Sequence, residues 1–261
     1  MVPHLKARPV SLVRTPAGIA SELFFQKHAQ AASIPGIKLL APELDPGHAP
    51  MLEIPSAAPS LQASQFNVTE FHTWNATATA RAIRKPDRMC FDLDPDTGVG
   101  WTEVQEAAQL VRTMLDEMSL ASFMKTSGGK ELRIVVPLTR SHDFDTVKDF
   151  SHAMESHLAR ALPQRLVEKS GPKNRIGKIF VDCISNGFGA TTVSAWSALA
   201  PPGMGVSVPV IWDELDVLTG GAHWTVQTLA SRLSMGHPPW GNYEPSSRGL
   251  TTAMKTLGFK P

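Results

Sequence analysis

Two aspartates at the end of an apolar run constrain the structure of this 261-residue chain more than any other feature. The run covers residues 88–93, contains Asp92, and is followed by Asp94 and Pro95. A β-strand directs alternate side chains to one face, so Asp92 and Asp94 should leave the strand end together. Like charges held this close repel unless a cation lies between them. Hard divalent cations such as Mg²⁺ and Mn²⁺ prefer such oxygen ligands, so the pair predicts part of a metal-dependent phosphoryl-transfer site.

Composition sets the class of protein but not its ligand. With 42% apolar residues, the chain can bury the core of one large α/β domain or of two closely packed subdomains. Lysine and arginine total 25 against 24 acidic residues. This balance argues neither for nor against nucleic acid, so any basic surface must be local.

The cysteines and the hydropathy pattern predict the compartment. Cys90 and Cys183 are the only cysteines, and each lies inside an apolar run close to an aspartate. Such a pattern suits buried thiols in a reducing cytoplasm better than a disulfide framework. The sequence contains no apolar stretch of about 20 residues and no signal peptide, so we expect a cytoplasmic protein without a membrane partner.

The order of predicted elements favours a mixed fold. Helical spacing of apolar residues predicts helices over residues 101–118 and 145–162, and a further helix is expected over 225–233. Residues 41–65, rich in Pro, Ala and Ser, are expected to be loop or irregular structure. Strands interleaved with helices favour an α/β or α+β class. The strands are predicted over residues 8–14, 24–28, 68–74, 88–93, 132–138 and 178–182.

Two further motifs extend the metal hypothesis. Ser127-Gly128-Gly129-Lys130 is a flexible turn whose backbone N–H groups and lysine could bind phosphates. Asp182 ends a strand of β-branched and aromatic residues and is placed to be a third metal ligand. Two metal ions bridged by shared carboxylates are the arrangement used for in-line nucleotidyl transfer.

Each motif also has an ordinary structural interpretation. An Asp-x-Asp before proline is more often a turn with solvated carboxylates, and Ser-Gly-Gly-Lys is usually a tight turn. Asp182 could cap a turn, and His72 on its own is more often a hydrogen-bonded histidine than a ligand. The pair Phe24-Phe25 is by default part of the core.

The order of these motifs resembles the polymerase domain of bacterial DNA ligase D, a member of the archaeo-eukaryotic primase group. The similarity runs almost end to end. The segments that carry it are Arg8-Pro9-Val10-Ser11-Leu12-Val13-Arg14, Phe24-Phe25-Gln26-Lys27-His28, Phe71-His72-Thr73-Trp74, Pro86-Asp87-Arg88, Phe91-Asp92-Leu93-Asp94-Pro95, Lys125-Thr126-Ser127-Gly128-Gly129-Lys130, Lys178-Ile179-Phe180-Val181-Asp182, Gly189-Ala190-Thr191, Trp212-Asp213-Glu214-Leu215 and Leu257-Gly258-Phe259-Lys260-Pro261.

The resemblance implies a primase-type α+β polymerase fold, with mixed sheets and flanking helices, as a single domain over residues 1–261. It also implies a template-directed nucleotidyltransferase that fills or extends broken DNA ends in non-homologous end joining. The cofactor would be Mn²⁺ or Mg²⁺ and the substrate a nucleoside triphosphate. The implied partners are DNA ends, ligase and phosphoesterase modules and the bacterial Ku end-binding protein, with a location at the nucleoid.

The resemblance also assigns roles to particular residues. The family's metal-binding carboxylates would correspond to Asp92, Asp94 and Asp182. Its nucleotide-binding residues would correspond to His72, Ser127 and Lys130, and its base-stacking aromatic to Phe24 or Phe25. Phosphate or DNA contacts are expected, by charge and position, from Arg14, Lys27, Lys173 and Arg175.

The sequence departs from the family pattern near the nucleotide site. The family's Gly-Leu-His after the turn reads Glu131-Leu132-Arg133 here, and Arg133 can still bind phosphate through its guanidinium. Arginines that the family carries after Asp182 and near Ala195-Trp196-Ser197 are replaced. The start is also shorter than in the family and lacks lysines that hold a 5′-phosphate there.

These departures leave more than one functional hypothesis open. The first is a working DNA-end polymerase, favoured by the intact carboxylates. The second is a degenerate, weak or inactive paralogue that acts as a DNA-binding module, favoured by the replaced arginines. A metal-dependent phosphohydrolase built on Asp92 and Asp94 is a more distant third, because no other motif supports it.

Overall fold

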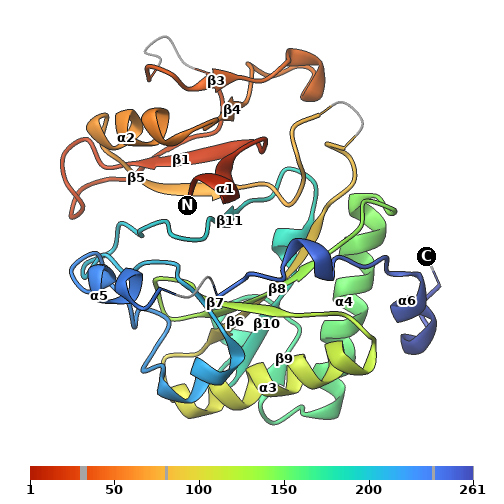
Figure 1. Ribbon diagram of the computed structural model, residues 1–261. Helices are drawn as coiled ribbons and strands as arrows, with labels where there is room; N and C mark the ends of the chain where they lie inside the picture. Colours follow the sequence, from red (N-terminus) through yellow and green to blue (C-terminus); the bar gives the residue numbers. More distant parts are fainter. Residues whose placement is uncertain (30–33, 80–81, 237–238, 261) are drawn as a thin grey trace.

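The computed structural model describes residues 1–29, 34–79, 82–236 and 239–260. Two six-stranded β-sheets form its framework, and they lie one above the other in Figure 1. The first sheet is built mainly from the N-terminal third of the chain. The second sheet is flanked by the long helices. This is the mixed α+β architecture that the sequence predicts.

The first sheet has the strand order β11-β5-β1-β4-β3, and β2 pairs with β1. Its core lies on one face, where Leu12 of β1 and Phe71 of β5 pack with Ala63 of α2. The elements of this part are α1 (Val2–Leu5), β1 (Val10–Arg14), β2 (Phe24–Gln26), β3 (Lys38–Leu39), the 3₁₀ helix η1 (Pro42–Leu44), β4 (Leu52–Glu53), α2 (Ala57–Gln65), β5 (Val68–Thr73) and β11 (Thr192–Val193).

The second sheet has the strand order β12-β7-β8-β6-β10-β9. Helices α3 and α4 lie along it in Figure 1, and together with the sheet they form the larger core. The elements are β6 (Arg88–Pro95), α3 (Trp101–Glu117), β7 (Phe123–Thr126), β8 (Leu132–Pro137), α4 (Phe144–Ala161), β9 (Leu166–Val167), η2 (Pro172–Asn174), β10 (Ile179–Asp182), η3 (Ile184–Asn186), β12 (Pro209–Val210), η4 (Trp212–Val217), α5 (Leu229–Ser234), η5 (Glu244–Ser246) and α6 (Thr251–Leu257).

Strand β6 separates apolar from charged side chains by simple alternation. Met89, Phe91 and Leu93 are fully buried in the larger core, against α3 and α4. Because side chains alternate along a strand, Asp92 and Asp94 leave the opposite face together. One face of β6 therefore packs in the core, and the other carries charged side chains that can take part in binding or catalysis.

The two sheets are joined through buried polar contacts at this opposite face. The Lys125 ammonium on β7 donates to the backbone carbonyl of Val193 on β11, at 2.9 Å. The Arg88 guanidinium on β6 donates to the Thr73 hydroxyl of β5 at 2.5 Å. Each contact crosses from one sheet to the other, so the charged face of the second sheet is turned toward the first.

Most predicted elements are confirmed, but the expectation of irregular structure over residues 41–65 is wrong. That segment contains η1, β4 and the nine-residue helix α2. Pro59 lies in the first turn of α2, where the missing N–H costs no helical hydrogen bond. The helix predicted over 225–233 begins later, at Leu229. In the described ranges, no helix combines the length and apolar character that crossing a bilayer requires.

Candidate active site

A row of four charged residues crosses the second sheet at the predicted metal site. Antiparallel pairing places Lys125 opposite Arg133, Arg133 opposite Asp92, and Asp92 opposite Asp182. Directly opposed residues on antiparallel strands share a face, so all four side chains leave the same side of the sheet. Lys125 contacts β11, which identifies this side as the one that faces the first sheet. The predicted carboxylates Asp92 and Asp182 are therefore neighbours in space.

Arg133 forms a two-pronged ion pair with Asp92. Its Nε donates to Oδ1 of the aspartate, and its Nη2 donates to Oδ2 at 2.5 Å. Both side chains are about nine-tenths buried, with relative exposures of 8% and 10%. Burial alone would lower the pKa of Arg133, but the adjacent Asp92 carboxylate outweighs it and raises that pKa above its ordinary value. The remaining nitrogen, Nη1, is buried without a hydrogen-bond partner among the described residues.

Asp94 is held by two other cations. The Lys130 ammonium lies 2.7 Å from Oδ1 of Asp94 and also donates to the backbone carbonyl of Pro95. Arg175 forms an ion pair with Oδ2 of Asp94. Three of the cations predicted to contact nucleotide or phosphate, Lys130, Arg133 and Arg175, are thus paired with predicted metal ligands.

Asp182 lies at the end of β10 with one oxygen already used. Its Oδ1 accepts the backbone N–H of Ile184 at 2.7 Å. Burial and the nearby charge of Asp92 raise the pKa of Asp182. Burial and Asp92 likewise raise the pKa of Glu131, which lies close to Arg133. This crowding of acids is the electrostatic pattern that a bound cation would relieve.

The donor set has the chemistry of a hard-cation site, although the three carboxylates are not among the described groups whose ligand atoms all lie within 4.8 Å of one another, and cations hold Asp92 and Asp94. Asp92, Asp94 and Asp182 present carboxylate oxygens from two adjacent strands, and such oxygens are the preferred ligands of Mg²⁺ and Mn²⁺. Arg133, Lys130 and Arg175 now supply the positive charge around these oxygens. A metal ion and these side chains would therefore compete for the same carboxylates.

The Ser127–Lys130 turn joins β7 to β8 beside the carboxylates. The Ser127 hydroxyl accepts the backbone N–H groups of Gly129 and Glu131, at 3.0 and 3.2 Å. The N–H of Gly128 donates to the carbonyl of Gly221. These N–H groups are directed into the turn and its neighbours. A phosphate-binding role for Ser127 stays a prediction.

Two glycines of the C-terminal segment allow this turn to pack closely. A Cβ on Gly205 would lie 2.0 Å from the carbonyl oxygen of Gly128, and one on Gly221 would lie 2.3 Å from that of Glu131. Gly128 itself has a φ of +87°, a left-handed conformation that glycine adopts without strain. The backbone of residues 205–221 therefore positions the turn that carries Lys130.

The predicted base-binding residues lie on the first sheet. Phe24 and Phe25 of β2 are 39% and 65% exposed, so neither belongs to the core. Their ordinary interpretation as core residues is therefore wrong, and their rings are accessible for stacking. His72 on β5 lies opposite Ser11 of β1, and its Nε2 contacts the Glu70 carboxylate at 2.7 Å.

The remaining predicted phosphate contacts are spread out. Lys27 is exposed just after β2, and Lys173 is exposed in η2. Arg14, at the end of β1, donates to the backbone carbonyl of Phe66 and lies 6.0 Å from the Phe24 ring centroid. Their roles toward DNA stay predictions.

Lys125 is the functional candidate that the sequence did not identify. Lys125 is 3% exposed. Its ammonium donates to the backbone carbonyl of Val193 at 2.9 Å and to the Ser207 hydroxyl at 2.6 Å. Burial, followed by the charge of Arg133, lowers its pKa well below the ordinary value. In the sequence, the only indication is the alternation of side chains along an extended chain, which places Lys125 on the same face as Ser127.

Comparisons with known proteins give a consistent result. Residues 1–240 match the family described as LigD, primase-polymerase domain. The chain is 50% identical over 253 residues to the multifunctional non-homologous end joining protein LigD of Pseudomonas aeruginosa, covering 96% of this chain and 30% of that protein. It is 29% identical to the corresponding LigD of Mycolicibacterium smegmatis, over 82% of this chain and 28% of the relative. The chain thus spans less than a third of either relative.

A solved structure shows the same fold. The polymerase domain from Mycobacterium tuberculosis ligase D in complex with DNA superposes with a TM-score of 0.85. The match covers 95% of this chain and 88% of that one, at 24% identity. The primase-type polymerase fold expected from the motifs is confirmed by this match. With a family match over residues 1–240 and half of its residues shared with one member, the chain belongs to the LigD primase-polymerase domain family.

Proposed function

We propose that the chain, as a single polymerase domain over residues 1–261, is a template-directed nucleotidyltransferase. It fills or extends broken DNA ends in bacterial non-homologous end joining. Family membership supports this, and two relatives that match nearly all of this chain are named as end-joining proteins. The structure of a relative's polymerase domain with DNA is consistent with DNA as the partner.

The observation that carries the proposal is the arrangement of three aspartates on two paired strands. Asp92 and Asp94 leave one face of β6, and Asp182 lies opposite Asp92 on β10. When bound, Mn²⁺ or Mg²⁺ would lower the charge barrier to attack of a primer 3′-hydroxyl on a nucleoside triphosphate. Catalysis would then rest on positioning and electrostatics, which this rigid pair of strands can provide.

The cations beside the aspartates have a second use in this proposal. Arg133, Lys130 and Arg175 pair with carboxylates, and a metal ion on those oxygens would release them toward the triphosphate. The exposed Phe24 and Phe25 rings offer a stacking face that accepts any base. Template pairing then supplies the choice of nucleotide.

The wider setting follows from the same family. We propose that the domain works in the cytoplasm at the nucleoid, with Ku at the DNA end and with ligase and phosphoesterase modules that complete the repair. The relatives are much longer than this chain, which leaves room for such modules beside the polymerase domain.

Primer extension tests the activity. A DNA duplex with a 3′ overhang is incubated with the protein, Mn²⁺ and labelled ribo- or deoxynucleoside triphosphates. We expect template-dependent extension that the double variant Asp92→Ala/Asp94→Ala lacks. Asp116→Ala on α3 is the matched control, since its side chain is 61% exposed and its partner Arg112 is 3.8 Å away.

Each result has one meaning. Extension by the parent protein and by Asp116→Ala, without extension by the double variant, supports the polymerase. DNA binding without extension by any variant would instead indicate a degenerate binding module. Release of phosphate from nucleotides without a template would indicate a hydrolase.

A further inference from the structure

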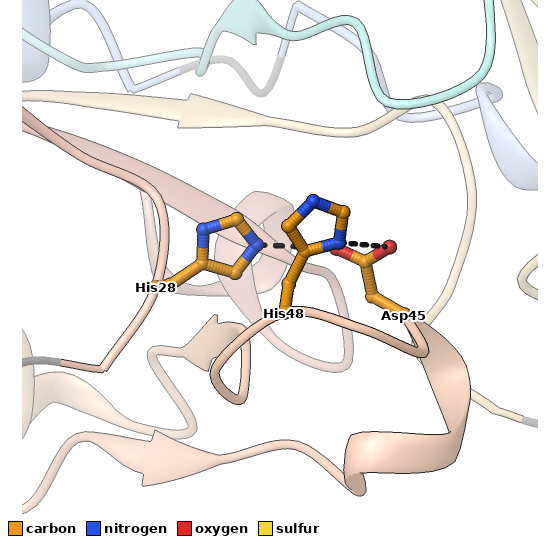
Figure 2. Close-up of side chains that lie close together, drawn as sticks. All are labelled: His28, Asp45 and His48. Atoms are coloured by element: carbon orange, nitrogen blue, oxygen red, sulfur yellow. Dashed lines mark hydrogen bonds and ion pairs between the residues drawn. The ribbon is translucent and has the colours of Figure 1, made fainter.

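Three side chains of metal-ligating types, none of them among the predicted aspartates, meet beside the first sheet. His28 Nε2 lies 3.1 Å from Oδ2 of Asp45, and His48 Nδ1 lies 3.3 Å from Oδ1 of the same carboxylate. Figure 2 shows both imidazoles directed at this carboxylate. One ligand atom from each residue lies within 4.8 Å of the others.

The backbone brings two distant segments together to form this cluster. His28 follows β2 and pairs with Met51 in an isolated antiparallel bridge. Asp45 directly follows η1, and the N–H of His48 donates to the Asp45 carbonyl to close a turn. Gly47 occupies the left-handed position of this turn, with a φ of +89°. The three side chains are thus held by hydrogen-bonded backbone on both segments.

The donor atoms are spaced as the ligands of one zinc ion would be. Zinc binds histidine nitrogen and carboxylate oxygen at about 2.0–2.1 Å, which places neighbouring ligands of a tetrahedron about 3.3 Å apart. The two nitrogen–oxygen separations are 3.1 and 3.3 Å, so an ion would replace the hydrogen bond between His28 and Asp45 with little movement of these atoms. Each neutral imidazole can keep its proton on the nitrogen that faces away from the cluster, as metal binding requires.

We infer that His28, Asp45 and His48 form a binding site for Zn²⁺ with one open coordination position. All three residues line a cavity of about 290 Å³, which is also lined by Lys27 and Trp74. The open position faces this cavity, where water or an anionic oxygen can complete the shell. A site with three protein ligands and an exchangeable fourth is the arrangement of catalytic rather than closed structural zinc.

The site is chemically distinct from the aspartate cluster. Two imidazoles and one carboxylate favour Zn²⁺ over Mg²⁺ and Mn²⁺, whereas an all-carboxylate set favours the harder ions. The His48 side chain is 61% exposed, so an ion can enter from solvent. The two imidazole rings are stacked, with 5.3 Å between centroids and 11° between planes.

Zinc titration of the chelator-treated full chain, in competition with a chromophoric chelator, tests the site. Two other groups could bind zinc, so the measurement uses an Asp92→Ala/Asp94→Ala/Cys183→Ser background. The last change disables the cluster of His152, Glu155 and Cys183. We expect one zinc per chain, with affinity reduced at least about tenfold by His48→Ala or by Asp45→Asn. His157→Ala on the exposed face of α4 is the matched control and should leave affinity unchanged.

An anomalous difference map at the zinc absorption edge, from crystals grown with Zn²⁺, locates the ion directly. A peak between the two imidazoles and Asp45 supports the site. No peak there, or a zinc affinity that His48→Ala and Asp45→Asn leave equal to that of His157→Ala, overturns it. Circular dichroism of each variant without metal shows whether the fold is kept, and rescue of zinc binding by His48→Cys would confirm a ligand role if His48→Ala were unfolded.

Discussion

The ion pair between Arg133 and Asp92 joins a permanent cation to a carboxylate on neighbouring strands, with side-chain exposures of 8% and 10%. Removing one partner of a buried pair leaves the other charge without compensation. Asp182, directly across the sheet from Asp92, adds a second negative charge to the same place. We therefore expect stability and metal binding to be coupled through Arg133.

We expect Arg133→Met to lower the free energy of unfolding by about 3–5 kcal/mol, because Asp92 then stays buried next to Asp182 without its guanidinium. Mn²⁺ should stabilise this variant more than the parent protein, because the ion replaces the missing positive charge. Urea unfolding with and without Mn²⁺ measures both effects. Arg165→Met, which breaks an ion pair with Glu106 whose side chains are 55% and 50% exposed, should cost no more than about 1 kcal/mol. An equal Mn²⁺ effect on parent and Arg133→Met would contradict the coupling.

His4 gives the fold a sensitivity to acid. Burial, aided by the positive charges of nearby Arg88 and Arg8, lowers the pKa of His4 to about 3 from an ordinary value of 6.5. Between these values the unfolded chain binds a proton at His4 and the folded chain does not. Stability is therefore fully present above pH 6.5 and falls as the pH drops from 6.5 toward 3.

We expect His4→Gln to remove this part of the acid sensitivity. Below pH 6, the free energy of unfolding of the parent protein should fall by up to about 1.4 kcal/mol per pH unit more than that of the variant. One pKa unit corresponds to that free energy. Urea unfolding at pH 7, 6 and 5 gives the comparison. Equal slopes for the two proteins would show that the pKa of His4 is the same in the folded and the unfolded chain.

The β7–β8 turn depends on the close approach of a neighbouring segment. A Cβ at Gly205 would lie 2.0 Å from the carbonyl oxygen of Gly128, and backbone atoms on both sides leave little room to move. We expect Gly205→Ala to lower stability by about 1–3 kcal/mol and to displace Lys130 from Asp94. Thermal unfolding and primer extension measure the two effects.

Gly98→Ala is the matched control for Gly205→Ala. A Cβ at Gly98 meets no atom within 4 Å, and its backbone is not in the left-handed region. We expect its stability to stay within about 0.5 kcal/mol of the parent protein. If the two substitutions had the same effect, the close approach of Gly205 would not position the turn.

Strand β6 and helices α3 and α4 could be predicted from the sequence because each has a strong period. Met89, Phe91 and Leu93 alternate with the charged face, and α3 and α4 carry a continuous apolar stripe. Helix α2 was missed because its Ala, Pro and Ser residues lack such a stripe. Strand β7, though its motif was recognised, was not predicted as a strand, since four residues carry too little pattern.

The chemistry of the site was only partly predictable. Asp92 and Asp94 could be placed on one face from their spacing, and Asp182 could be proposed as a third ligand from its place at the end of a strand. Pairing of Arg133 with Asp92 required the register between β6 and β8, which the sequence does not state. The meeting of His28 with Asp45 and His48 depends on a bridge between distant segments, so local patterns could not reveal it.

The molecule as a whole carries almost no net charge, with a formal value of +1. It therefore has no uniform positive field to attract DNA, and any affinity must come from particular cations. Arg133, Arg175 and Lys130 are already paired with aspartates. Lys27 and Lys173 are exposed and remain as candidates for phosphate contacts.

This distribution of charge predicts how salt should act on DNA binding. Each phosphate contact released by a substitution should reduce the slope of log affinity against log salt by about 0.9 on duplex DNA. We expect Lys27→Ala and Lys173→Ala each to make the salt dependence less steep by about this amount. The reason is that an exposed lysine that contacts phosphate displaces one condensed counterion. Lys255→Ala, an exposed lysine in the last turn of α6, should leave the slope unchanged. Fluorescence anisotropy with a labelled 3′-overhang duplex over a range of salt concentrations measures the slopes. If Lys27→Ala and Lys173→Ala behaved like Lys255→Ala, these two lysines would not contact phosphate, and an affinity that rises when Mn²⁺ is added would indicate binding through the cations now paired with the aspartates.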